Sequence, residues 1–196
     1  MRIAERGLRN ADCKTEDAQT DRSRPAARGF VIPQSAFRNP QSRRVLFVCT
    51  GNTCRSPLAA GVCRAMLAAR LGCAEGDLPA RGFVIESAGV AAAPGDVASP
   101  EAVDVARRYG ADLSGHRSQM VTPEMLAAAT DVLAMTHGHG MLLALRYPDA
   151  GARVRLLGGP GGDVPDPIGG GRDVYELCAA VIAGHLDGHL AEWVGP

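Results

Sequence analysis

Aromatic side chains, long apolar runs and net charge are what this 196-residue sequence has least of. Phe, Trp and Tyr make up 4% of it, which is too few for the stacking platform of a single-stranded nucleic-acid binder. Its 21 basic and 21 acidic residues cancel, so non-specific binding to nucleic acid or to a membrane surface is not expected. No apolar run approaches the roughly 18 residues of a membrane span, and the N-terminus lacks the apolar centre of a signal peptide. A soluble, cytoplasmic protein without nucleic-acid or membrane partners is predicted.

The cysteines are too few and too scattered for a secreted disulfide scaffold, which favours a reducing cytoplasm. A zinc site needs tighter groups of ligands, and Cys49 with Cys54 supplies only two. The sequence therefore predicts neither a metal nor another cofactor. The six cysteines are Cys13, Cys49, Cys54, Cys63, Cys73 and Cys178.

The composition divides the chain into a tail and one domain. Residues 1–42 are rich in Arg, Ser, Gln, Asn and Pro and show no sustained apolar period. They predict a disordered extension or a gene start assigned too early, and their acidic residues argue against a transit peptide. Residues 43–196 are long enough for a single domain with a sizeable core.

Apolar patterning within 43–196 predicts strands that alternate with helices. The strands are expected at 45–48, 83–85, 131–136 and 154–157, and the helices at 57–71, 101–109, 122–129, 138–147 and 173–193. This alternation predicts an α/β fold, a doubly wound and mostly parallel sheet with helices on both faces. Ligands of such sheets bind beyond the carboxyl ends of the strands, where the loop after residue 48 and the glycine-rich stretch 158–171 would meet.

Three local features carry further expectations. Ser56 is predicted to cap the helix that follows it. The last helix is predicted to bury a stripe formed by Val174, Leu177, Cys178, Val181, Ile182, Leu186 and Leu190. Among the histidines, we expect His137 and His139 to cap or line a loop rather than to bind metal, and we expect His185 and His189 to face solvent.

The loop between the first strand and first helix has the composition of a phosphate site. Cys49 is followed six positions later by Arg55. A loop that wraps a helix start points several N–H groups inward and forms a cradle for anions. Its field favours the thiolate of Cys49, and the planar guanidinium of Arg55 can hold two phosphoryl oxygens. The predicted reaction is attack of Cys49 on phosphorus, which gives a cysteinyl phosphate that water then hydrolyses.

Such a reaction also needs a general acid for the leaving group and a base for the water. The candidates are Asp163, Asp166 and Asp173, in or beside the glycine-rich stretch. Asp166 is favoured because Pro165 and Pro167 restrict the backbone on both sides of it.

The stretch VLFVCTGNTCRSP, from Val45 to Pro57, resembles the low-molecular-weight protein tyrosine phosphatase family. Further matching stretches follow in order: Ser87-Ala88-Gly89, Leu113 to Arg117, Asp131 to Thr136, and Asp166-Pro167. The resemblance covers about residues 43–194. It implies a three-layer sandwich with a four-stranded parallel sheet of order 2-1-3-4. It also implies phosphorylated proteins as substrates, and it leaves the oligomeric state open.

The resemblance also implies roles for individual residues. Cys49 would be the nucleophile, Arg55 the phosphate binder and Asp166 the general acid and base. Substrate-binding positions would be Thr50, Gly51, Asn52, Thr53, Cys54 and Ser56, with Ser87 and His116 supporting the loop. Cys54 matches a second family cysteine that can bond reversibly to the nucleophile under oxidants.

Within the family, the chain is most similar to the bacterial protein-arginine phosphatase branch, in Thr50 to Thr53, Ala134 to His137 and Asp166 to Gly170. In that branch a threonine at the position of Thr53 favours phosphoarginine. Tyrosine-specific members carry aromatics after Asp-Pro, whereas Ile168 and Gly169 follow here, so the pocket has few flat walls for a phosphotyrosine ring. The substrate is therefore phosphoarginine or phosphotyrosine.

Two other function classes are considered. An arsenate reductase of the same fold would need further cysteines near the site, but no cysteine lies between Cys73 and Cys178. An inactive binding module would not need Cys49, Arg55 and Asp166 together.

Overall fold

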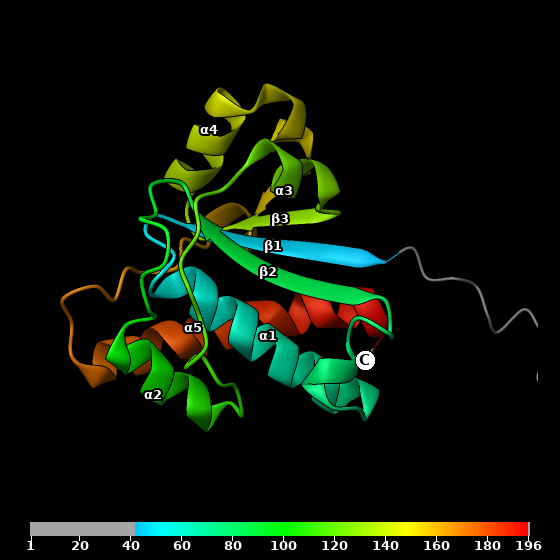
Figure 1. Ribbon diagram of the computed structural model, residues 1–196, viewed down its shortest axis with the longest axis vertical. Helices are drawn as coiled ribbons and strands as arrows, with labels where there is room; N and C mark the ends of the chain where they lie inside the picture. The colour runs from blue at the N-terminus through cyan, green and yellow to red at the C-terminus, as the bar shows by residue number, and fades with distance from the viewer. Residues whose placement is uncertain (1–41, 196) are drawn as a thin grey trace, which may run out of the picture. The chain divides into compact units, whose positions relative to one another are not determined.

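A four-stranded parallel sheet forms the middle layer of the domain (Figure 1). The computed structural model describes residues 42–195, so nearly all of the expected N-terminal extension lies outside the described residues. The strand order is β2-β1-β3-β4, which confirms the expected 2-1-3-4 sheet. The strands are β1 Arg43–Cys49, β2 Phe83–Gly89, β3 Asp131–Ala134 and β4 Val154–Leu156.

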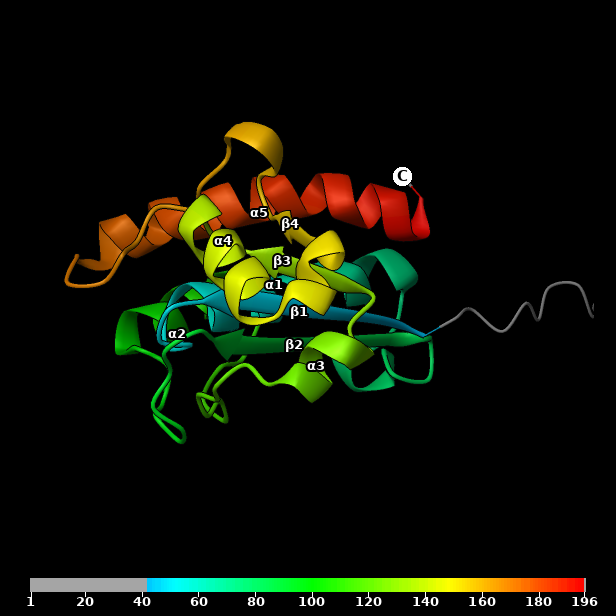
Figure 2. The ribbon, with the colours of Figure 1, turned by 90° about the horizontal axis from the view of Figure 1, so that it is seen from above.

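Helices cover both faces of this sheet, which confirms the three-layer sandwich. In Figure 1, α1, α2 and α5 lie on one face and α3 and α4 on the other. Figure 2 shows α5 along the side of the sheet where β4 lies, with β2 at the opposite edge. The helices are α1 Arg55–Leu71, α2 Pro100–Arg108, α3 Pro123–Ala128, α4 His137–Arg146 and α5 Arg172–Val194; short 3₁₀ turns span Glu75–Asp77, Pro148–Arg153 and Gly159–Gly161.

Strand β1 is buried on both faces and separates two apolar cores. Val45 and Phe47 pack into the cluster that includes α1, α2 and α5. Leu46 and Val48 pack into the cluster that includes α3 and α4. Because side chains alternate along a strand, this central strand holds both helix layers at fixed positions relative to the Cys49 loop.

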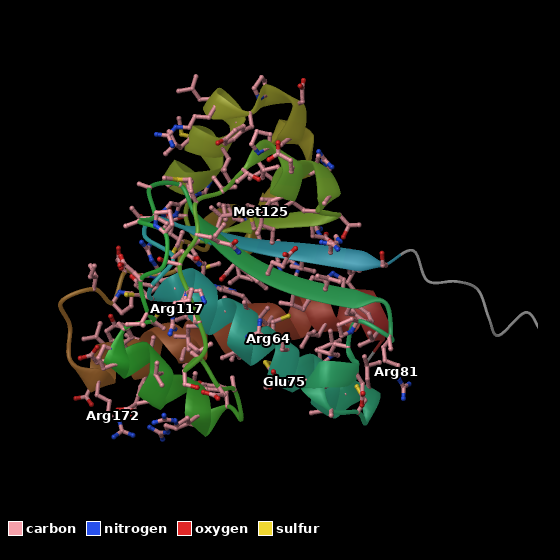
Figure 3. All side chains as sticks on the ribbon, viewed as in Figure 1. Arg64, Glu75, Arg81, Arg117, Met125 and Arg172 are labelled. Atoms are coloured by element: carbon pink, nitrogen blue, oxygen red, sulfur yellow. The ribbon has the colours of Figure 1, made fainter. Side chains whose placement is uncertain are left out.

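Polar contacts add to the α1 side of the domain. Arg64 of α1 forms an ion pair with Glu75 of the following turn, with Nε and Oε2 3.5 Å apart (Figure 3). Both side chains are partly exposed, so this pair contributes well under about 1 kcal/mol to stability. Among residues 42–195, no helix is long and apolar enough to cross a bilayer.

Three expectations from the sequence are wrong. Helix α1 begins at Arg55, so Ser56 lies inside it and caps nothing. On α5, Val174 and Leu177 are exposed, while Cys178, Ile182, Leu186 and Leu190 are buried as expected. The physical reason is that the first turns of α5 extend past the sheet beside α2. His185 and His189 are only partly exposed, and His189 Nε2 donates to the Leu157 carbonyl at 3.0 Å.

The site end of the domain is where the strands finish and the loops gather, at the left of Figure 1. The backbone N–H of Met135 donates to the Val48 carbonyl at 2.9 Å, which ties the end of β3 to the end of β1. The N–H of Val164 donates to the Met135 carbonyl at 2.8 Å. These bonds bring the stretch 158–171 to the same edge as the Cys49 loop, as the sheet rule predicts.

Candidate active site

The loop from Cys49 to Arg55 is held by the side chain of Asn52. Asn52 has φ 56°, a left-handed conformation that asparagine tolerates better than most residues. Its Nδ2 donates to Ser56 Oγ at 2.8 Å and to Ser87 Oγ at 2.9 Å. Its Oδ1 accepts from the Gln119 N–H at 2.9 Å. One buried amide therefore ties the loop to α1, to β2 and to the segment that follows α2.

Cys49 lies at the end of β1, with one backbone N–H directed at its sulfur and one hydroxyl beside it. The N–H of Asn52 points to Cys49 Sγ at 3.3 Å. Ser56 Oγ is 3.0 Å from the same sulfur, and it also donates to the Ala88 carbonyl at 3.2 Å. The loop therefore holds the Cys49 sulfur within hydrogen-bonding distance of a backbone N–H and a hydroxyl.

Gly89 allows β2 to approach the loop closely. A Cβ on Gly89 would lie 2.4 Å from the Thr50 carbonyl oxygen and 3.0 Å from the Asn52 nitrogen. The N–H groups of Val90 and Ala91 donate to the Cys49 and Thr50 carbonyls at 2.9 and 3.0 Å. The Ser-Ala-Gly stretch therefore has a steric reason for its glycine that sequence reasoning did not identify.

Arg55 is buried and points toward Asp166. Its Nη2 donates to Asp166 Oδ2 at 2.6 Å, and its Nη1 donates to the Val164 carbonyl at 3.4 Å. The two residues line a pocket of about 300 Å³ together with the loop that begins at Cys49. The pocket is lined by Cys49, Thr50, Gly51, Thr53, Cys54, Arg55, Asp166 and Ile168.

The other two candidate acids do not line this pocket. Asp163 accepts from the His137 N–H at 2.8 Å and lies 3.2 Å from His137 Nδ1. This backbone hydrogen bond is the main cause that holds the pKa of Asp163 below its usual value, so the carboxylate is a poor proton donor. Asp173 lies in the first turn of α5. Of the three candidate acids, Asp166 alone lines the pocket with Cys49.

His116 and Ser87 support the loop from outside the pocket. His116 Nε2 donates to the Asn52 carbonyl at 2.7 Å. Burial is the main cause that lowers the pKa of His116, which favours a neutral ring at pH 7. Ser87 accepts from Asn52, and its carbonyl accepts from Gln119 Nε2 at 3.0 Å. Gln119 and its two bonds were not expected from the sequence.

Cys54 is not bonded to Cys49, and none of the five described cysteines forms a disulfide. Its Sγ lies 3.2 Å from the hydroxyl of Tyr175, a buried residue of α5. Burial, followed by the hydrogen bond with Cys54, raises the pKa of Tyr175 to about 12. Sequence reasoning missed Tyr175 because 121 positions separate it from its partner.

Two further cysteines, Cys63 and Cys178, are poor candidates for redox chemistry. Cys63 and Cys178 are fully buried, and burial raises the pKa of each thiol to about 12. A thiol reacts as its thiolate, so neither favours the arsenate-reductase alternative. Among residues 42–195, no three His, Cys, Asp or Glu side chains gather closely enough to bind a metal ion.

His139, which the sequence predicts to cap or line a loop, lies beside the loop from Cys49 to Arg55. It is buried near the start of α4. Its Nε2 lies 2.9 Å from Thr50 Oγ1, in the phosphate loop, and its Nδ1 lies 2.7 Å from Thr136 Oγ1. No local pattern indicates this contact, because 89 positions separate His139 from Thr50.

Comparisons with known proteins agree with this geometry. Residues 44–193 match the family model of the low molecular weight phosphotyrosine protein phosphatases. A protein-arginine-phosphatase of Geobacillus stearothermophilus is 42% identical over 76% of this chain and 94% of that protein. A protein-arginine-phosphatase of Bacillus subtilis is 38% identical over 67% of this chain and 84% of that protein.

Solved structures give the same result. A low molecular weight protein tyrosine phosphatase from T. tengcongensis superposes with a TM-score of 0.69 at 39% identity, over 77% of this chain and 99% of that one. A mutant of the YwlE arginine phosphatase that carries a phosphorylated active-site serine superposes with a TM-score of 0.68 at 33% identity, over 76% of this chain and 94% of that one.

Proposed function

This chain belongs to the low molecular weight phosphotyrosine protein phosphatase family, and we propose that it removes phosphoryl groups from protein side chains through a cysteinyl phosphate on Cys49. The enzyme class, a low molecular weight protein phosphatase, follows from the family. The roles of individual residues and the choice of substrate are our proposal, and the geometry of the pocket supports it.

In the first step, the Cys49 thiolate attacks phosphorus from the side opposite the leaving group. The loop N–H groups and the Arg55 guanidinium hold the phosphoryl oxygens and stabilise the charge that builds on them. An S–P bond forms as the P–N or P–O bond to the substrate breaks. The leaving atom takes the proton of the Asp166 carboxyl group. In the unliganded site Arg55 binds Asp166 instead, so the phosphoryl group replaces the carboxylate as its partner.

In the second step, water attacks phosphorus of the cysteinyl phosphate. Asp166, now a carboxylate, accepts a proton from that water. The S–P bond breaks, the electron pair returns to the Cys49 sulfur, and inorganic phosphate leaves. The thiolate and the protonated Asp166 are then restored, so no cofactor is consumed in the cycle.

The observation that carries the substrate proposal is the wall of the pocket. Thr53 and Ile168 line it, and among the described residues that do so there is no aromatic side chain to stack on a phosphotyrosine ring. The exposed carboxyl group of Asp166 instead offers a hydrogen-bond partner for the guanidinium group that leaves. Phosphoarginine is the favoured substrate, in line with the names of the two arginine-phosphatase relatives.

Turnover of phosphoarginine against phosphotyrosine peptides tests this proposal. In Thr53→Ile, a β-branched aliphatic group replaces the hydroxyl that lines the pocket. The ratio of kcat/KM for phosphoarginine to kcat/KM for phosphotyrosine should fall by about tenfold or more. The reason is that a lost hydrogen bond costs about 1 kcal/mol or more in a transition state.

Thr53→Ser is the matched control, since it keeps the hydroxyl and should keep the wild-type ratio. An unchanged ratio in Thr53→Ile would remove the argument for phosphoarginine but not the phosphatase activity. Failure of the wild type to hydrolyse p-nitrophenyl phosphate and both peptides would contradict the whole proposal.

A further inference from the structure

His139 connects the phosphate loop to the start of α4 through two hydroxyl groups. One ring nitrogen bonds Thr50, which follows Cys49 directly, and the other bonds Thr136, which precedes α4. The imidazole ring is buried, whereas Thr50 is exposed and lines the pocket. The histidine therefore touches the loop from the side away from the substrate.

The bonds of Thr136 allow the proton of the His139 ring to lie on Nε2. Thr136 Oγ1 accepts from the backbone N–H of His139 at 3.3 Å, as the cap of α4. Its own hydroxyl proton is then free to point at Nδ1, 2.7 Å away. In that arrangement Nδ1 accepts, and a neutral ring carries its single proton on Nε2. In this tautomer Nε2–H donates to Thr50 Oγ1, 2.9 Å away.

A hydrogen bond that His139 donates to Thr50 Oγ1 limits the directions in which the Thr50 hydroxyl proton can point. Because Nε2–H faces the oxygen, the Thr50 proton cannot point at His139 and is directed elsewhere. The pocket is the open side of Thr50. The hydroxyl is then a donor held ready for a phosphoryl oxygen, in addition to the loop N–H groups and Arg55.

The charges around His139 favour this neutral state. Burial is the main cause that lowers the pKa of the ring, and the Arg55 guanidinium lowers it further. The carboxylates of Asp166 and Asp163 oppose this effect without reversing it. The ring is therefore neutral at pH 7.

We propose that His139 is a positioning residue for phosphoryl transfer, which holds the Thr50 hydroxyl with its proton directed at the phosphoryl group. The inference rests on the proposed function of the Cys49 pocket and adds a further donor to it. A role in folding alone explains less, because Thr136 already caps α4 through the His139 backbone N–H.

Two substitutions separate the two ring nitrogens. In His139→Gln, the amide nitrogen can reach the place of Nε2 and donate to Thr50. In His139→Asn, the shorter amide reaches only the place of Nδ1 and Thr136. We expect kcat for p-nitrophenyl phosphate to fall about tenfold in His139→Asn and to stay within about threefold of wild type in His139→Gln, since a hydrogen bond to a charged group is worth about 1.5 kcal/mol.

A double-mutant cycle with Thr50→Val shows whether His139 acts through Thr50. Thr50→Val should lower kcat about as much as His139→Asn, and the double variant should be no slower than Thr50→Val alone. A further tenfold loss in the double variant would overturn the inference. Melting temperatures of all four proteins separate this effect from a loss of folded enzyme.

The ring proton can also be observed without any turnover. In ¹⁵N-labelled protein, the two imidazole nitrogen shifts distinguish a proton on Nε2 from one on Nδ1, and we expect the His139 proton on Nε2. A proton on Nδ1 would overturn the inference while leaving the phosphatase proposal intact. A wild type without phosphatase activity would overturn the proposed function, and this inference with it.

Discussion

Two clusters of arginine and aspartate lie at opposite ends of the sheet, and their burial is reversed. At the carboxyl ends of the strands, the Arg55 side chain is 6% exposed and its partner Asp166 is 45% exposed. At the other end, Asp131 is 8% exposed and bonds two arginines, Arg43 and Arg155, that are 31% and 43% exposed. One end therefore buries the cation and the other buries the anion.

The cluster at Asp131 is structural, because it links separate elements of the fold. Arg43 Nη1 lies 2.7 Å from Asp131, which links the start of β1 to the start of β3. The Arg43 guanidinium also lies 5.4 Å from the ring of Trp193, near the end of α5, where cation–π attraction adds to the contact. Every partner of the buried carboxylate is part of the fold, so nothing in this cluster needs to exchange.

The cluster at Arg55 has an exchangeable partner. The buried guanidinium is fixed between the loop and the Val164 carbonyl, and a low-dielectric setting strengthens its hold on an anion. Asp166 is exposed, so in the proposed mechanism it can give up its place to a phosphoryl group and regain water. An arginine–aspartate pair does not by itself mark a binding site. The two clusters differ in which partner is exposed to solvent: the anion in the proposed binding site, and the cations in the structural cluster.

The largest expected effect comes from Arg55→Lys, which keeps the charge but removes the planar fork. We expect kcat/KM for p-nitrophenyl phosphate to fall by about 10²- to 10³-fold, the usual cost of a lost donor to transition-state charge. The same change at the other end, Arg43→Lys, should keep kcat/KM within about twofold. A comparable loss in Arg43→Lys would contradict the separation of the two ends.

A second test exchanges each carboxylate for an amide and expects opposite results. Asp131→Asn should lower the free energy of unfolding by about 2 kcal/mol, because a buried partner of two arginines loses its charge. Asp166→Asn should change it by less than about 1 kcal/mol, since that carboxylate is exposed. Urea denaturation of both variants measures the two values.

Activity of the same two variants completes this test. Asp166→Asn should lower kcat for p-nitrophenyl phosphate about 10²-fold, because the amide cannot exchange a proton. Asp131→Asn should retain wild-type kcat while folded. If Asp166→Asn lowers the free energy of unfolding more than Asp131→Asn does, the assignment of Asp131 to a structural cluster and of Asp166 to the active site is contradicted.

The smallest expected effect concerns a contact at the site end that contributes only stability. Tyr175→Phe removes the hydrogen bond to Cys54 and should cost about 1 kcal/mol at pH 7. Because the pKa of Tyr175 is raised from 10 to about 12 in the folded protein, the unfolded chain binds fewer protons between these values. The free energy of unfolding of the wild type therefore falls in this pH range as pH rises. The difference in free energy of unfolding between wild type and Tyr175→Phe should be smaller at pH 11 than at pH 7.

Cys63 and Cys178, whose thiols also have raised pKa values, destabilise both proteins equally at alkaline pH, so the difference isolates Tyr175. Unfolding in urea at pH 7 and at pH 11 provides the measurement. If the difference in free energy of unfolding between the two proteins is the same at both pH values, the fold does not hold Tyr175 in its neutral form.

Local patterns were enough to predict the sheet and the main parts of the pocket. The apolar run before Cys49 defines a buried strand, and the spacing to Arg55 places the two residues at the two ends of one loop. Asp166 was selected because prolines flank it, and the structure brings its carboxylate to Arg55. The positions of Val174 and Leu177 were predicted wrongly, because a helical period does not say where the sheet beneath it ends.

What the sequence by itself determined is the order of the elements, the Cys49–Arg55 loop and the choice of Asp166 as the candidate acid. These depend on residues close together in the chain, where strand period, turn chemistry and motif spacing act directly. Tertiary structure alone decided that His139 bonds Thr50, that Tyr175 bonds Cys54 and that Gly89 lies against the loop. Those contacts join residues 39 to 121 positions apart, and only the packing of strands and helices around one sheet edge brings them together.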